Sequence, residues 1–459
     1  MKEPRWCASD RSHVVGIPVT VLLAFAVLPN AANAQASLAL AEGENITFAR
    51  DVMPILQDNC QVCHQPGAIG PMSLMTYEEV RPWAQVIKER VAEREMPPYH
   101  YDTDIGIQEL KQDKRLSVEE IQTIVQWVDQ GLEFGDAEDM PAPVKWPDAS
   151  EWRLASVLGQ PDHVISSTPY TVPAAGQDLW HKPVVSSNIN EVRCIKALEV
   201  KPRADGRAAV HHSNPYWRYP DEDGVVQLLG PGGESITEYA LGKLGEIVPD
   251  DACREVRPGA MVGWDIHYYP SGAELADHTV ELGIWFHEPG EEPEYKQNLR
   301  LYLLQGGIDI LPPNETAMTQ GFHTFDHPVR IDSFQPHGHL RLVAKSLEVF
   351  YPETGEREVI SMVSNWNPRW HLSHIYEEDV APLLPKGAVM ILTAWYDNTE
   401  NNPHNPDPDM WVGRGNRTTD EMSHGWIAVT HLDEERYQEL LAERPTEEED
   451  GAQERATSN

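Results

Sequence analysis

Positive charge is scarce in this 459-residue chain, which has 36 Lys and Arg against 73 Asp and Glu and a formal net charge of -37. A protein this acidic is repelled by phosphate backbones and anionic lipids, so nucleic acid and anionic membrane surfaces are excluded as expected partners. After the N-terminus the chain lacks any apolar run long enough to span a bilayer. It also lacks internal repeats, and low-complexity sequence is confined to the tail, which argues against a repeat array.

Residues 1–34 have the features of an export signal. Three basic residues precede the apolar stretch 14–28, and a small-x-small sequence ends at Ala34. We therefore expect cleavage near Ala34 and a mature protein in the periplasm. An uncleaved membrane anchor is the alternative.

Cysteine is also scarce, with five residues in the whole chain. Cys7 is lost with the export signal, and two others form the motif described next. Cys194 and Cys253 remain as an even pair in an oxidising compartment, so we expect a disulfide bond between them. Two free buried thiols are the alternative.

The sequence Cys60-Gln61-Val62-Cys63-His64 has the spacing of a c-type haem attachment site. In such a site the thiols of Cys60 and Cys63 bond the haem vinyl groups while the imidazole of His64 reaches the iron. Met96, which two prolines follow, is the expected distal ligand, because thioether ligation is common in electron-transfer cytochromes. His100 is the alternative ligand. The motif predicts a covalently bound haem (heme c), and residues 46–135 are similar to single-haem cytochrome c domains fused to bacterial oxidoreductases.

The hydrophobic pattern divides the chain into several domains. Capping boxes at Thr76–Glu79 and Ser117–Glu120 precede apolar residues at helical spacing, which favours helices. After about residue 155, short apolar or alternating runs are separated by Pro, Gly, Asn and Asp, as in antiparallel β-sandwiches or jelly rolls. We expect a multidomain protein, an all-α cytochrome c domain followed by all-β tandem jelly-roll domains. The expected segments are a signal peptide at 1–34, the cytochrome c domain at 44–137, a linker at 138–154, jelly-roll copper domains at 155–305 and 306–440, and a disordered acidic tail at 441–459.

Histidine is plentiful, and most of its 19 residues follow position 180. His337 and His339 are two apart, so on a strand both point to one face and can hold one ion. His211 and His212 are adjacent and share a metal only at a bulge or a strand end. Imidazole suits copper, zinc, iron and nickel alike, whereas Met422, a soft thioether in a polar stretch, favours copper.

In their order along the chain these motifs resemble those of the type II copper monooxygenases, the family of peptidylglycine alpha-hydroxylating monooxygenase and dopamine beta-monooxygenase. The resemblance spans about residues 155–435: a His-His pair, a His-Tyr, a His-x-His and an Asp-Glu-Met, with Tyr-Asp-Asn-Thr before the last. It implies two consecutive jelly-roll domains with one copper each. It also implies an electron-transfer copper held by His211, His212 and His267. The oxygen-activating, catalytic copper would be held by His337, His339 and Met422.

Three positions differ from the peptide-amidating members of that family. Gln335 stands where they have an arginine two residues before the His-x-His, and His424 and Trp426 replace their asparagine and tyrosine. Loss of the guanidinium removes a bidentate grip on a carboxylate, so we expect a small organic substrate other than a peptidylglycine. Gln335, His424 and Trp426 are the candidate substrate contacts.

The resemblance and the haem motif together predict a monooxygenase that inserts one atom of O2 into a C–H bond. An external donor would reduce the haem, which would reduce the two copper ions in turn. The alternatives are a periplasmic electron-transfer or copper-binding protein without oxygenase activity, and a haem-linked dehydrogenase. Seven further histidines are interpreted as ordinary core or surface residues: His278, His287, His323, His327, His371, His374 and His404.

Overall fold

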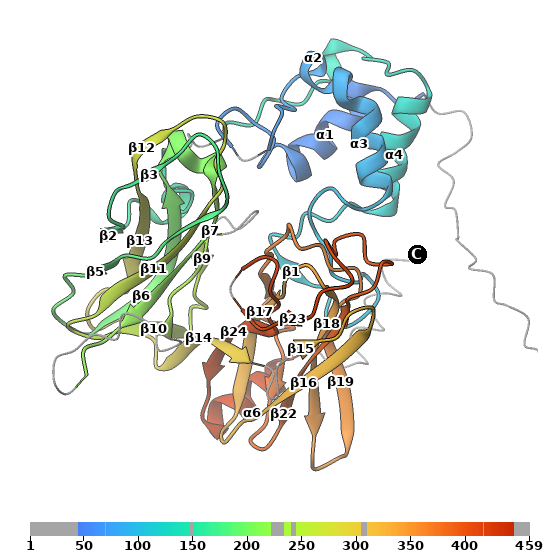
Figure 1. Cartoon of the computed structure of the whole chain (residues 1–459). Coiled ribbons are helices and arrows are strands. Elements are labelled where there is room, and N and C mark those ends of the chain that lie inside the picture. Colours follow the sequence, from blue (N-terminus) through green and yellow to red (C-terminus); the bar gives the residue numbers. More distant parts are fainter. Residues whose placement is uncertain are drawn as a thin grey trace, which may run out of the picture. The chain divides into compact units, whose positions relative to one another are not determined.

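A computed structural model of the chain describes residues 45–68, 70–146, 150–221, 234–239, 245–303, 310–415 and 417–444 (Figure 1). The described residues all belong to one compact unit, residues 43–459. The expected export signal at 1–34 lies outside the described residues, as does the acidic tail beyond residue 444. Among the described residues, no helix combines the length and the apolar character needed to cross a membrane.

Short helices make up most of the regular secondary structure in residues 45–140. They are η1 (Phe48–Val52), α1 (Met53–Ile55), η2 (Leu56–Cys60), α2 (Tyr77–Val80), η3 (Arg81–Trp83), α3 (Ala84–Ala92), α4 (Val118–Asp129) and η4 (Ala137–Asp139). Both expected capping boxes are formed, at the starts of α2 and α4. Phe48 packs between Tyr77 and Trp127, with ring centroids 5.2 Å and 5.6 Å away. Burial of these aromatic rings holds α4 against the first helices.

Residues 97–111 leave this helical segment and pack against the C-terminal β region. Tyr101 and Leu110 are buried in the core of that region. The short strand β1 (Leu110–Lys111) pairs with β20 (His374–Tyr376). The helical segment expected over 44–137 is therefore interrupted by a stretch that belongs, by packing, to the β region.

From residue 155 on the structure is almost entirely β, with α5 (Ala155–Leu158), η5 (Ala204–Ala209) and α6 (Glu434–Glu443) as the helices of its described part. The first strands are β2 (His163–Ser166), β3 (Tyr170–Val172), β4 (Leu179–His181), β5 (Val184–Ser186), β6 (Arg193–Pro202), β7 (Val210–Arg218), β8 (Glu234–Ser235), β9 (Glu246–Ile247), β10 (Ala252–Val256), β11 (Met261–Tyr268), β12 (Leu275–His278), β13 (Val280–Phe286) and β14 (Tyr295–Leu303). The later strands are β15 (Ile310–Leu311), β16 (Thr316–Thr324), β17 (Val329–His337), β18 (Leu342–Tyr351), β19 (Glu356–Val363), β21 (Leu383–Leu384), β22 (Val389–Asp397), β23 (Val412–Gly413) and β24 (His424–His431).

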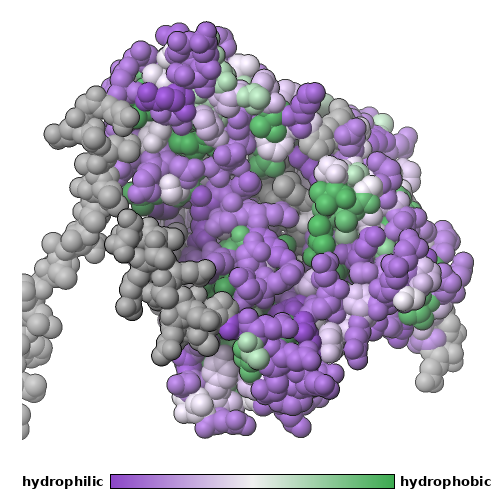
Figure 2. Space-filling view, turned by 180° about the vertical axis from the view of Figure 1, so that it is seen from behind, coloured by the Kyte–Doolittle hydropathy of each residue, from purple (hydrophilic) through white to green (hydrophobic). Residues whose placement is uncertain are grey.

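These strands form sandwich sheets around two hydrophobic cores. One core lies among β2, β6, β7, β10, β11 and β13, and the other among β17, β24 and the four-stranded sheet β16-β22-β18-β19. The expectation of a mostly β fold with sandwich sheets is thus confirmed. Figure 2 shows a face that is largely hydrophilic, with hydrophobic residues in separate small patches.

Strand β14 joins the two cores in one continuous sheet. It pairs in parallel with β10 and antiparallel with β24, so the sheet runs β1-β20-β17-β24-β14-β10-β6-β13-β2. The sequence placed a domain break shortly after β14, and residues 304–309 lie outside the described residues. Strands β7 and β11, which carry His211, His212 and His267, therefore belong to the same sheet as β17, which carries His337.

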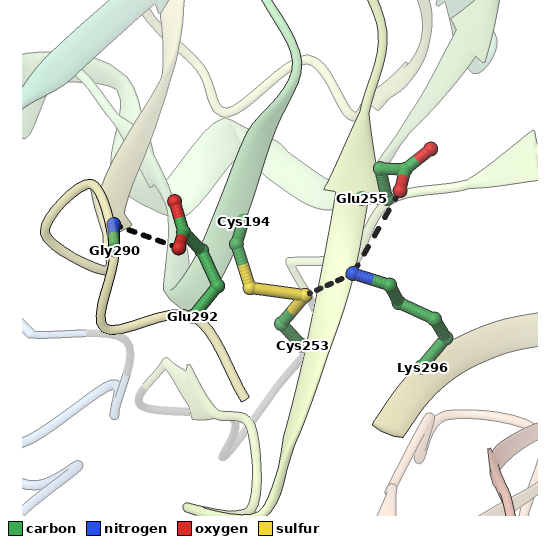
Figure 3. The surroundings of a disulfide bond; sticks show 6 residues. All are labelled: Cys194, Cys253, Glu255, Gly290, Glu292 and Lys296. Carbon is green, nitrogen blue, oxygen red and sulfur yellow. Dashed lines mark hydrogen bonds and ion pairs between the residues drawn. A yellow bond between two sulfur atoms is a disulfide. The ribbon is translucent and has the colours of Figure 1, made fainter. Parts of the chain in front are cut away.

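The expected disulfide bond is present between Cys194 on β6 and Cys253 on β10 (Figure 3). The two strands are neighbours in the sheet, and the Cα atoms are 5.5 Å apart. Both cysteines are buried, and the Lys296 ammonium lies 3.3 Å from the sulfur of Cys253. The bond closes a chain segment of 59 residues.

Candidate metal centre

His211, His212 and His267, here called the histidine triad, come from two paired strands. His267 on β11 lies opposite His212 on β7, while Tyr268 pairs with Val210. His211 is therefore the extra residue of a β-bulge. A bulge turns a side chain that would otherwise point to the opposite face of the sheet. The candidate ligand atoms of the triad consequently all lie within 4.8 Å of one another.

The triad is uncharged at neutral pH. Burial lowers the pKa of His211 and of His267 to about 4, and that of His212 well below its usual value. The Nδ1 atom of His211 lies 3.4 Å from that of His267 and 3.2 Å from that of His212. Converging neutral imidazole nitrogens are the donor set that copper or zinc satisfies.

Two further side chains, Asp178 and Trp180, contact the ring of His267. Its Nε2 atom lies 3.3 Å from the Asp178 carboxylate, and the Trp180 ring stacks on it at a centroid distance of 4.3 Å. A carboxylate near one ring nitrogen favours a proton there, which leaves the other nitrogen free for a metal. This arrangement fits Nδ1 as the metal-binding atom of His267.

His337, His339 and Met422, here called the His-Met set, lie at the ends of two neighbouring strands. His337 ends β17, and Met422 lies two residues before the start of β24. The fully buried carboxylate of Glu421 accepts hydrogen bonds from the backbone N–H groups of His339, Arg341 (2.9 Å) and Met422 (2.8 Å). One side chain therefore ties the His-x-His loop to the methionine.

His339 is oriented by a further hydrogen bond. Its Nδ1–H donates to the carbonyl oxygen of Asp420 at 3.1 Å, which leaves Nε2 available to a cation. Beneath the set, the buried Lys345 donates from Nζ to the carbonyl oxygens of His337 (2.7 Å) and His424. Burial lowers the pKa of Lys345 to about 7. Lys345 thus links the ends of β17 and β24 below the candidate ligands.

The triad and the His-Met set line one cavity of 830 Å³. Of the three expected substrate contacts, His424 and Trp426 line this cavity as well. His424 stacks on His337 at 4.6 Å and packs edge-on against Trp426. Gln335 does not line the cavity: it is buried, and its side-chain oxygen lies 3.4 Å from the Ser373 hydroxyl.

His371 lies between the two groups, although the sequence gave no reason to place it there. Its ring centroid is 5.4 Å from that of His211, 5.3 Å from His212 and 5.0 Å from His337. Burial lowers its pKa to about 3. The sequence assigns it to the ordinary histidines, because a histidine is more often a hydrogen-bonded core or surface residue than a metal ligand. The one available signal was a pair of histidines, His371 and His374, in a proline-containing loop rich in tryptophan.

The Cys-x-x-Cys-His motif begins at Cys60, the last residue of η2, and both of its thiols are free. The Nδ1–H of His64 donates to the Met72 carbonyl oxygen at 3.1 Å, so its Nε2 is left for iron. A Cβ at Gly70 would lie 2.7 Å from this Nδ1 atom, so only glycine fits beside the ring. Burial raises the pKa of Cys60 to about 12, which argues against a thiolate nucleophile. The residues present therefore fit a c-type haem.

The two candidate distal ligands have different surroundings. Met96 is 37% exposed, at the start of the loop whose next residues, Pro97 to Tyr99, line a hollow with Cys63. His100 is buried between Trp366 and Trp370, and neither of its ring nitrogens has a hydrogen-bond partner among the described residues. Met96 thus adjoins the loop that lines the hollow with Cys63, whereas the ring of His100 packs against tryptophans of the β region.

No family model and no curated protein matches this chain. Similar solved structures include N-glycanase F (PNGase F), with 10% identity over 59% of this chain and 96% of that one and a TM-score of 0.28. PNGF-II has 10% identity over 59% and 66% of the two chains, with a TM-score of 0.24. The major capsid protein P2 from bacteriophage PM2 has 8% identity over 58% and 97%, with a TM-score of 0.23. Likeness at this level supports no statement about function.

Proposed function

We propose that this chain is a copper-dependent monooxygenase that hydroxylates a C–H bond of a small organic substrate with O2. Its electrons would enter through a c-type haem attached at Cys60 and Cys63. One observation carries the proposal: six residues singled out from motif order alone, between positions 211 and 422, line a single cavity. Chance placement of four separate motifs around one cavity is a poor explanation, because they lie on different strands and loops.

The finer domain assignment is part of this proposal. Residues 44–137 would be the cytochrome c domain, and 155–305 and 306–440 the two jelly-roll copper domains, joined to it by the linker 138–154. The export signal and a periplasmic location are proposed on the sequence of residues 1–34. The haem motif agrees with export, because c-type haem is attached outside the bacterial cytoplasm.

The chain's own residues would do the following. The triad would hold one copper and the His-Met set the other, and His64 and Met96 would hold the haem iron. Copper, when bound, supplies one-electron redox chemistry and the activation of O2. Glu421 holds His339 and Met422 at a fixed separation, and Asp178 holds the tautomer of His267. Such fixed ligands reduce the rearrangement that each change of oxidation state requires.

The cavity wall also indicates a substrate class. His424 and Trp426 give the wall beside His337 a neutral, partly apolar character, since burial keeps the pKa of His424 well below its usual value. Gln335 supplies no guanidinium at the position where the peptide-amidating members have one, and Arg369, the arginine among the residues lining the cavity, comes instead from the loop between β19 and β20. These features support a small organic substrate bound through its apolar or aromatic part rather than a peptidylglycine.

Metal analysis and isotope labelling test the function. The purified mature protein is expected to contain two copper ions and one iron per chain, and labelled O2 should place one labelled oxygen atom in the product. Iron without copper would instead indicate an electron carrier, and product free of the label would indicate a haem-linked dehydrogenase.

Substitution Met422→Ala tests the site itself. It removes the thioether and is expected to abolish turnover while leaving the haem spectrum unchanged. Met410→Ala is the matched control, because Met410 is 50% exposed and does not line the cavity. Retained turnover in Met422→Ala would refute the assignment of Met422 as a ligand.

A further inference from the structure

One loop forms a wall of two different hollows. Residues 364–373 connect β19 to β20. From this loop, Arg369 and His371 line the 830 Å³ cavity of the triad and the His-Met set. Leu372 and Ser373 instead line the hollow that Cys63 also lines. The candidate haem site and the candidate copper site are therefore separated by this loop and the side chains packed on it.

Aromatic rings fill this wall in an unbroken series. Tyr99, which lines the hollow beside Cys63, stacks on His374 with centroids 5.0 Å apart and an interplanar angle of 21°. His374 lies 5.9 Å from His100, and His100 stacks on Trp370 at 5.7 Å and 26°. These four rings are here called the ring stack.

The far end of the ring stack reaches the histidine triad. His371 follows Trp370 directly in the chain, and its ring lies 5.4 Å from His211 and 5.3 Å from His212. A side branch runs from His100 to Trp366 at 5.1 Å, and the indole Nε1–H of Trp366 donates to the carbonyl oxygen of His339. The triad is thus connected to Tyr99 through neighbouring rings and the one backbone step from Trp370 to His371, and the His-Met set through the hydrogen bond from Trp366 to the His339 carbonyl oxygen.

Packing alone does not account for the histidines of the ring stack. Both ring nitrogens of His100 and both of His374 are buried with no hydrogen-bond partner among the described residues. A buried polar atom without a partner costs free energy that a leucine or a phenylalanine of similar size would avoid. The need to fill space therefore does not explain why imidazole rings stand at these two positions.

We infer that the ring stack, continued by His371, is the path along which electrons cross from the c-type haem to the copper of the histidine triad. This inference rests on the proposed function. Each transfer oxidises one haem iron from Fe(II) to Fe(III) and reduces one copper from Cu(II) to Cu(I), with no bond formed and no proton moved. Rings in contact provide delocalised orbitals across the loop, whereas saturated side chains at the same places would interrupt them.

Anaerobic pulse reduction of the copper-loaded mature protein tests the inference. A photogenerated reductant delivers one electron to the haem, and the haem absorbance then reports the rate at which that electron leaves. Trp370→Leu and, separately, His100→Leu are expected to slow this rate about tenfold or more, a change of about 1.4 kcal/mol in activation free energy. Trp370→Phe keeps a ring and should retain most of the rate.

Trp152→Leu is the matched control, because Trp152 and Trp370 are both 7% exposed and Trp152 packs on Trp285, away from both hollows. Copper content, haem absorbance and the copper paramagnetic signal are measured for every variant. Slow transfer in Trp370→Leu and His100→Leu, with metal content intact and Trp152→Leu unaffected, supports the path. An unchanged rate in both ring-stack variants overturns it. Wild-type protein that binds no copper or no haem would instead refute the proposed function, before any variant is compared.

Discussion

Glu421→Ala gives the most demanding test of how the candidate copper site is built. The carboxylate is fully buried and accepts three backbone hydrogen bonds, from His339, Arg341 and Met422. Its removal leaves three N–H groups without an acceptor. If each orphaned donor costs about 1–2 kcal/mol, the free energy of unfolding should fall by about 3–6 kcal/mol.

The same substitution should weaken copper binding at the His-Met set. Loss of a residue that orients a metal ligand typically costs about 10- to 100-fold in metal affinity. Glu421 orients two of the three ligands, so a loss towards the upper end of that range is expected. Copper affinity is measured by titration in competition with a chelator, and stability by urea unfolding of the metal-free protein.

Glu199→Ala separates lost stability from lost affinity. Glu199 is also buried, and its carboxylate accepts hydrogen bonds from the backbone N–H groups of Arg153 and Leu154, both at 3.0 Å. With two orphaned donors it should lose about 2–4 kcal/mol of stability and no copper affinity. If Glu421→Ala lowers copper affinity no more than Glu199→Ala does, the reasoning about Glu421 is refuted.

Glu421→Gln covers the case in which the alanine variant fails to fold. One carboxylate oxygen accepts from both His339 and Met422, and the other accepts from Arg341. The amide can keep the first oxygen and places its NH2 group against the Arg341 N–H. Stability and copper affinity between those of the wild type and the alanine variant are therefore expected.

Three further predictions use other parts of the structure. Replacing both Cys194 and Cys253 with serine opens a 59-residue segment and should lower the free energy of unfolding by about 4 kcal/mol in urea titrations, with an unchanged haem spectrum. Burial lowers the pKa of His100 to about 3, so the folded protein keeps this ring neutral at pH values where the unfolded chain protonates it. The free energy of unfolding is therefore unaffected by His100 above pH 6.5 and falls as the pH drops from 6.5 towards 3. In His100→Leu the fall in unfolding free energy between pH 7 and pH 5 should accordingly be smaller by about 2 kcal/mol, and an unchanged slope would contradict this assignment. Gly70→Ala pushes a methyl group against His64 and should alter the haem absorbance, whereas Gly131→Ala, with open space around the new Cβ, should leave it unchanged.

Features encoded locally could be predicted from the sequence. The two capping boxes depend on residues three apart, and both are formed. The alternation of apolar and polar residues after position 155 depends on strand geometry, which repeats every two residues. The disulfide followed from two remaining cysteines and an oxidising compartment. From the sequence, adjacent His211 and His212 could share a metal only at a bulge or a strand end. The structure has a bulge there.

Features that depend on long-range pairing could not be predicted. The placement of residues 97–111 on the β region, and of β14 between two cores, follows from which strands pair, and no local pattern specifies that. His371 sits in a loop without periodicity, so its position follows only from the sheets on either side. Gln335 occupies the expected sequence position, yet it does not line the cavity, and its side-chain oxygen lies against the Ser373 hydroxyl.

The two candidate copper sites differ in what holds them. The triad rests on β7 and β11, whose backbone hydrogen bonds run along the whole strand pair, so its geometry is set before any metal binds. The His-Met set joins a strand end to a loop, and its geometry depends on Glu421 at the side and Lys345 beneath. Loss of Glu421 should therefore release copper from the second site while the first stays filled. One copper retained in Glu421→Ala, bound as tightly as in the wild type, would show that the two sites are built independently although they share a cavity.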